Sequence, residues 1–235
     1  MDFGKAFAFV FEDDQWITKV LLAAAILLLG VAFSWVLAIP LILAALLLGG
    51  YSVEVTRRVI QGDPDALPDW DDWGQLFADG LKVWVIGIVY ALPIIVVSLC
   101  LSIPTGMLAE NAEGASGFFG FLLGCFNFLW AIVLSIVMPA AVGHFVAKDD
   151  MGAAFRFGEV FALVRDNLST YLLTFLMTWV AQIIGGLGSL VCGVGVLVTY
   201  PYSIMVIGNL YGQAYLEATG QTAPAVVDVV DVESE

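Results

Sequence analysis

Charged residues divide the chain into a few long apolar stretches. Four stretches contain no Asp, Glu, Lys or Arg: residues 20–53, 83–109, 114–147 and 167–216. A helix crosses about 30 Å of hydrocarbon with roughly 20 residues. The last stretch has 50 residues, which is too long for one crossing and suits two crossings with a turn between them. The glycines between Gly185 and Gly195 interrupt helix and mark that turn.

The first stretch, residues 20–53, is ambiguous by its length alone. Its 34 residues fit either one helix of about 50 Å or two short crossings, with a turn at residues 30–34 or at Pro40. The positions of Lys and Arg decide, because these residues collect in cytoplasmic loops. If every stretch crosses once, two of the eight basic residues are cytoplasmic. If the first and last stretches are hairpins, all eight are cytoplasmic.

We therefore expect an all-α integral membrane protein with six transmembrane helices, arranged as three helical hairpins. It would be a multi-pass protein of the cell membrane with both termini cytoplasmic. One membrane domain would cover residues 1–220, followed by an acidic, disordered cytoplasmic tail over residues 221–235. The expected helices are residues 17–35, 38–60, 82–103, 118–147, 168–187 and 195–218.

The pattern Asp-x-Gly-x-x-Phe occurs three times, each time ahead of an apolar run. The copies begin at Asp2, Asp72 and Asp150. This recurrence predicts three related units, at about residues 2–62, 72–148 and 150–220. Each unit would open with an Asp that caps an amphipathic helix lying in the membrane interface. The apolar faces of these helices are Phe3, Phe7 and Phe11; Trp73, Phe77 and Leu81; and Phe157, Phe161, Val164 and Leu168.

Composition supports the membrane assignment. The chain is 61% hydrophobic and 13% charged, with a mean hydropathy of +0.97, whereas soluble domains are about half apolar and a quarter charged. Its net charge of −14 argues against nucleic acid as a partner. An acidic, lysine-poor surface tolerates high salt, so a salt-loving host and a plain acidic surface are both open interpretations.

The loop after the first hairpin, residues 63–72, is rich in Asp. An EF-hand loop needs Gly at its sixth position and Glu at its twelfth, but counting from Asp63 these places hold Pro68 and Gly74. We therefore do not expect calcium binding. Arg57 and Arg58 are expected to pair with lipid phosphates or with the Asp cluster. Trp70 and Trp73 suit the lipid headgroup layer.

We assign no catalytic, cofactor-binding or metal-ligating residue. His144 is the single histidine, and no carboxylate, nucleophile or second ligand is evident beside it, so an interfacial or packing role is expected. Isolated cysteines in apolar segments behave as small hydrophobes. These are Cys100, Cys125 and Cys192. The polar residues of the spans would bond helices together or line a path for a small neutral solute. They are Ser98, Ser102, Asn127, Ser135, Thr174, Thr178, Gln182 and Asn209.

Several stretches resemble an uncharacterised family of archaeal and bacterial membrane proteins, domain of unknown function 4013. They are residues 2–7, 11–16, 50–59, 62–72 and 79–93, and Leu67-Pro68-Asp69-Trp70-Asp71-Asp72 is the most family-like of them. The resemblance extends over nearly all of residues 1–220, and the acidic composition is similar to that of a haloarchaeal member. It implies a multi-pass membrane protein and supplies no activity and no functional residue.

Two functions lead at this point, and an enzyme, which would need catalytic groups drawn from the interfacial Asp, Trp and His residues, ranks third. The first is a non-enzymatic membrane scaffold or an envelope or lipid-associated component, because the chain shows no catalytic constellation and no charge deep in a span. The alternative is a small-solute transporter or channel-like permease built from hairpin repeats. The expected partners are membrane lipids and other membrane proteins.

Overall fold

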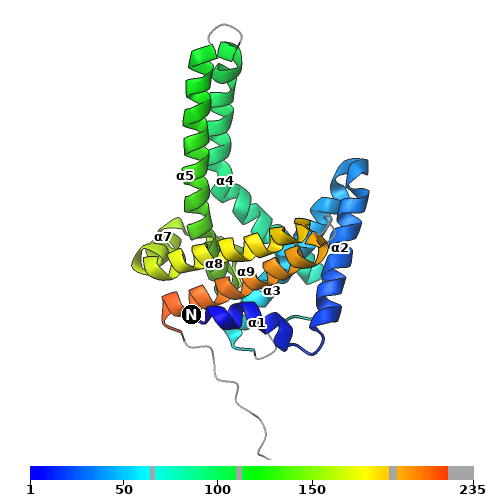
Figure 1. The fold of residues 1–235 in the computed structure, drawn as a ribbon. Coiled ribbons are helices and arrows are strands. Elements are labelled where there is room, and N and C mark those ends of the chain that lie inside the picture. Colours follow the sequence, from blue (N-terminus) through cyan, green and yellow to red (C-terminus); the bar gives the residue numbers. More distant parts are fainter. Residues whose placement is uncertain (64–66, 110–112, 191–194, 222–235) are drawn as a thin grey trace, which may run out of the picture.

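The computed structural model describes residues 1–63, 67–109, 113–190 and 195–221, and these ranges contain helices and no strand. Figure 1 shows their arrangement. In chain order the elements are α1 (Phe3–Glu12), α2 (Trp16–Leu37), α3 (Ile39–Gln61), α4 (Trp73–Ala109), α5 (Glu113–Lys148), α6 (Met151–Ala154), α7 (Phe157–Asp166), α8 (Leu168–Leu187), the 3-10 turn η1 (Gly188–Leu190) and α9 (Val196–Thr219). Cys192 and the tail beyond Gln221 lie outside the described residues.

The first apolar stretch forms two helices, as the charge argument predicts. The break falls at Ala38, whose φ of 60° is left-handed, and Pro40 stands at the start of α3. The segment 30–34, which was the other candidate for the turn, lies inside α2. Proline has no N–H to donate inside a helix, but it is tolerated in the first turn of a new one. The chain therefore breaks just before Pro40, whereas the helix continues through Gly30. At its other end α3 stops at Gly62, which adopts φ 75°.

The predicted surface helix at residues 72–81 is not a separate element. It is the first part of α4, which runs without interruption from Trp73 to Ala109. No proline or turn sequence separates Leu81 from the apolar run after it, so the helical hydrogen bonds continue. The other two predicted surface segments do form separate helices, as α1 and as α6 with α7. The helix α4 bends along its length (Figure 1), and Pro93 in its middle removes one hydrogen bond of the helical ladder.

The three aspartates of the repeated pattern cap helices, as predicted. Asp2 accepts a hydrogen bond from the backbone N–H of Lys5 at 2.9 Å, and Asp72 accepts one from Gln75 at 3.0 Å. Asp150 accepts one from the N–H of Gly152 at 2.9 Å. Each carboxylate thereby satisfies one of the free N–H groups at a helix start.

Helix α9 lies at the centre of the bundle. It packs along α8 and α3 and also touches α2, α5, α1 and α7 (Figure 1). Five described helices are long and apolar enough to cross a membrane: Trp16–Phe33, Ile39–Gln61, Trp73–Ile103, Gly117–Lys148 and Leu168–Leu190. Helix α9 is not among them. Because much of its surface faces other helices, it has less need of apolar residues than a lipid-facing span.

The α4–α5 hairpin projects beyond the rest of the bundle (Figure 1). Only 11% of the apolar span of α4 and 6% of that of α5 is buried, compared with 44% in α3. Large apolar side chains such as Leu99, Phe121 and Leu129 are exposed on it. At the other end of the hairpin, by contrast, α4 packs against α3 and α6, and α5 packs against α3, α6, α7, α8 and α9.

Candidate functional site

Charged residues gather where α3 ends and α4 begins. The guanidinium of Arg57 pairs with Glu54 on its own helix and, at 2.8 Å, with Asp79 of α4. Asp79 also accepts a hydrogen bond from Lys82 at 2.8 Å, and Asp149 lies 4.0 Å from Arg57. The side chain of Asp79 is only 3% exposed. The network therefore joins α3, α4 and the link after α5, and Arg57 pairs here with protein carboxylates outside the 63–72 loop.

The Asp-rich loop folds back onto α3. The ring of Trp70 stacks on Tyr51 with centroids 4.4 Å apart, and the Tyr51 hydroxyl donates to the carbonyl of Pro68 at 2.8 Å. Trp70 and Leu67 are buried in the core. The ring of Trp70 therefore packs against protein, and its place at the depth of the lipid headgroups stays a prediction. Trp73 remains 43% exposed, as a headgroup residue would be.

Lys19 fixes the same loop to α2. Its ammonium donates to Asp13 at 2.8 Å and to the carbonyl of Leu67 at 3.0 Å, and it pairs with Asp69 at 3.0 Å. An ammonium has three hydrogens, so these three partners use all of them. A polar hollow of about 240 Å³ opens beside Lys19, lined also by Arg58. Arg58 lies 3.9 Å from Asp63, which agrees with the expected pairing to the Asp cluster.

His144 does have a carboxylate partner, contrary to the sequence-based expectation. Its Nε2 lies 3.0 Å from Glu159 of α7, which is 15 residues further along the chain. Lys148 donates to the same Glu159 oxygen at 2.9 Å. On the other side of the ring the Tyr215 hydroxyl of α9 lies 3.5 Å from Nδ1. The bonds from Lys148 and His144 lower the pKa of Glu159 to about 2.

Several polar residues of the spans bond to their own helices, and one pair bonds between helices. Ser98 and Asn127 form a hydrogen bond of 3.2 Å between α4 and α5, as the prediction of interhelical bonding requires. Ser102, Ser135 and Thr174 donate instead to carbonyls three or four residues earlier in the same helix. Such bonds satisfy the hydroxyls in hydrocarbon without joining helices.

Most of the basic residues that the structure describes pair with carboxylates. Within the part of the chain that the structure describes, no three His, Cys, Asp or Glu residues are placed to hold a metal ion. Cys100 and Cys125 are exposed on the projecting hairpin, and Gln182 is exposed on α8. The charged end of the bundle is therefore built to hold helices and the 63–72 loop together.

The helical architecture, the apolar helices and the charges gathered at helix ends are compatible with a multi-helix membrane protein. The chain belongs to the family described as Protein of unknown function (DUF4013), whose model matches residues 33–194. The resemblance to this family is thus confirmed. The match does not include residues 2–7 and 11–16, on which part of the resemblance was based. No curated protein and no solved structure matches the chain.

Proposed function

We propose that the protein is a non-enzymatic membrane scaffold, and that the α4–α5 hairpin is its surface for transmembrane helices of other proteins. The observation that carries this proposal is the exposure of the hairpin, whose outer part has no helix of the same chain beside it among the described residues. A helix surface in lipid gains little from the hydrophobic effect, so association depends on close packing.

The hairpin offers a place for such packing. On α5, a Cβ added to Gly117, Gly120 or Gly124 would meet no atom within 4 Å. The spacing of Gly120 and Gly124 is that of the small-xxx-small pattern through which transmembrane helices approach closely. A partner helix could therefore lie against the backbone of α5 at this point.

The proposal includes a topology of six crossings with both termini cytoplasmic. The backbone N–H of Asp2 donates to Gln213 near the end of α9 at 2.8 Å, and Figure 1 places the N-terminus beside that end. An even number of crossings accounts for this proximity, and α9 would be the sixth. The pairing of Lys19, Arg57 and Arg58 at one end of the bundle supports a single cytoplasmic side.

Affinity purification from detergent extracts of native membranes tests the scaffold. We expect specific membrane proteins to copurify with the wild-type chain and to be reduced about ten-fold with Gly120→Leu and Gly124→Leu combined. The control is Gly186→Leu on α8, where an added Cβ likewise meets nothing within 4 Å. A wild-type protein that always purifies alone contradicts the proposal.

The transporter alternative stays a prediction. Asn127, which we expected to line its path, is bonded to Ser98, and this bond fits a role in holding the hairpin together. The salt-loving, archaeal origin also stays a prediction.

A further inference from the structure

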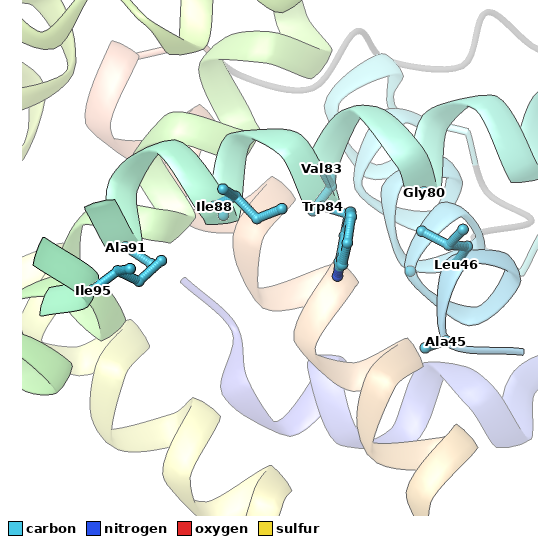
Figure 2. A pocket seen from close by; sticks show the side chains of 10 residues that line it. Ala45, Leu46, Gly80, Val83, Trp84, Ile88, Ala91 and Ile95 are labelled. Carbon is cyan, nitrogen blue, oxygen red and sulfur yellow. The ribbon is translucent and has the colours of Figure 1, made fainter. Parts of the chain in front are cut away.

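We propose that an apolar groove between α3 and α4 holds one chain of a bilayer glycerolipid, with an oxygen of the glycerol region accepting a hydrogen bond from Trp84. The groove has a volume of about 330 Å³. Figure 2 shows Ala45 and Leu46 at one end, Ala91 and Ile95 at the other, and Trp84 between them. This site is independent of the partner surface on the α4–α5 hairpin.

The groove exists because α3 and α4 touch around Gly50 and Gly80 and then separate. At Gly80 an added Cβ would lie 1.8 Å from the carbonyl oxygen of Leu46, so the two backbones are in direct contact. At Gly87, two turns further along α4, an added Cβ would meet nothing within 4 Å. The space between the diverging helices is lined by apolar side chains and glycines. It lies along two of the segments that are long and apolar enough to cross a membrane, so we place most of it at the depth of the lipid chains.

The size of the groove favours a single lipid chain over a helix. From Gly80 to Ile95 the groove follows α4 for about 22 Å. A helix with side chains is at least about 10 Å wide, so a piece of this length would need roughly 1,700 Å³. A groove of 330 Å³ cannot enclose a helix of that size, but it suits a narrow, flexible hydrocarbon chain.

Trp84 supplies the polar contact that would orient the lipid. Its side chain is 53% exposed, and its indole N–H makes no hydrogen bond to a described residue. It lies five residues beyond Asp79 of the ion-pair network, or about 7.5 Å along the helix. This depth is the interfacial layer, where tryptophan rings meet the headgroup and glycerol region. A lipid ester oxygen there can accept the indole hydrogen while its chain extends past Gly87 toward Ile95.

The test uses the full chain reconstituted in dioleoyl phosphatidylcholine vesicles that contain a small fraction of phosphatidylcholine with a diazirine in one acyl chain. Irradiation attaches the lipid to nearby side chains, and mass spectrometry of peptides locates the adducts. The readout is the ratio of adducts on the groove peptides, residues 83–95, to adducts on the exposed outer part of α5, residues 117–129. A held lipid raises this ratio at least roughly five-fold above that for bulk lipid.

Two variants and a control make the result specific. Gly87→Leu fills the groove and should return the ratio to the bulk value, whereas Gly186→Leu, which adds the same side chain to an open face of α8, should not change it. Trp84→Phe keeps an aromatic ring but removes the donor, so the ratio should fall about five-fold, the effect of one lost hydrogen bond. If the Gly87→Leu variant does not fold, Gly87→Ala replaces it, and we then expect a partial decrease of the adduct ratio.

A wild-type adduct ratio equal to that for bulk lipid overturns the proposal, because lipid would then contact the groove no more than any other exposed surface. Adducts that are insensitive to both Gly87→Leu and Trp84→Phe overturn it too. Cross-links between two copies of the chain at residues 83–95, in place of lipid adducts, would mean that a protein surface fills the groove. None of these outcomes depends on whether partners copurify through the hairpin.

Discussion

The carboxylate of Asp79 lies 2.8 Å from the guanidinium of Arg57 and joins α4 to α3 where both side chains are largely buried. Replacing one partner of a buried pair leaves the other charge without compensation, which costs about 3 kcal/mol or more. We expect Asp79→Asn to lower the free energy of unfolding by about 3 kcal/mol, because Arg57 would then keep only Glu54 of its own helix and the more distant, exposed Asp149. Thermal unfolding of the detergent-solubilised protein measures this loss.

Asp166→Asn is the matched control for this prediction. Asp166 pairs with Arg165 at 3.0 Å, but both side chains are well exposed. Exposed pairs contribute between about 0 and 1 kcal/mol, so the unfolding temperature should hardly change. Equal shifts for the Asp79 and Asp166 variants would contradict the assigned role of the network.

The close approach of α3 and α4 gives a second prediction. A Cβ on Gly80 would lie 1.8 Å from the Leu46 oxygen and 3.0 Å from the backbone nitrogen of Gly50, and backbone atoms cannot move aside as a flexible side chain can. We expect Gly80→Ala to destabilise the fold by about 3 kcal/mol, since it forces the two helices apart. The loss should be visible as a lower unfolding temperature and as loss of monodisperse protein in size-exclusion chromatography.

Gly87→Ala on the same helix should do the opposite. The added methyl meets nothing within 4 Å, and alanine is favoured over glycine inside a helix by about 1 kcal/mol. The prediction fails if Gly80→Ala and Gly87→Ala change stability in the same direction and by similar amounts.

Local sequence signals predicted most of the helix ends. The expected limits of the helix at 168–187 coincide with α8, and the ends at Gly62 and at Pro40 follow from what glycine and proline permit. The aspartate caps were also predictable, because each is a contact between near neighbours. The sequence did not predict that α4 continues through Leu81. Amphipathic periodicity shows that residues 73–81 are helical, but it does not show whether that helix ends before the fully apolar segment begins.

The contacts between distant residues could not be predicted. Nothing local in the sequence pairs His144 with Glu159 or stacks Tyr51 on Trp70, because both contacts depend on how the chain returns on itself. Trp70 illustrates the consequence. As a tryptophan next to an apolar helix, it was expected in the headgroup layer. The loop after α3 buries its ring in the protein core. The paired charges at the bundle end likewise arise from tertiary packing.

The backbone at Ala38 gives a third prediction. Its φ of 60° is a left-handed conformation that costs a residue with a Cβ about 1–2 kcal/mol and costs glycine little. We expect Ala38→Gly to stabilise the α2–α3 hairpin by about 1 kcal/mol, seen as a higher unfolding temperature. Ala32→Gly, inside α2, should lower stability by about 1 kcal/mol, because glycine disfavours helix. Two changes of the same sign would show that the turn at Ala38 is not strained.

The docking of α7 onto α5 should weaken in acid because of Glu159. Its pKa is lowered to about 2 by the bonds from Lys148 and His144, so it binds its proton more weakly in the folded protein than in the unfolded chain. A carboxyl group with a depressed pKa stabilises the fold fully above its ordinary value of 4.5, and the contribution is lost as the pH falls toward about 2. The unfolding temperature of the wild type should therefore fall more steeply between these pH values than that of Glu159→Gln, which has no proton to bind there. Subtracting the two curves removes the effect of the other carboxylates. Parallel curves for the two proteins over this window would mean that the contacts of Glu159 with His144 and Lys148 do not stabilise the folded state.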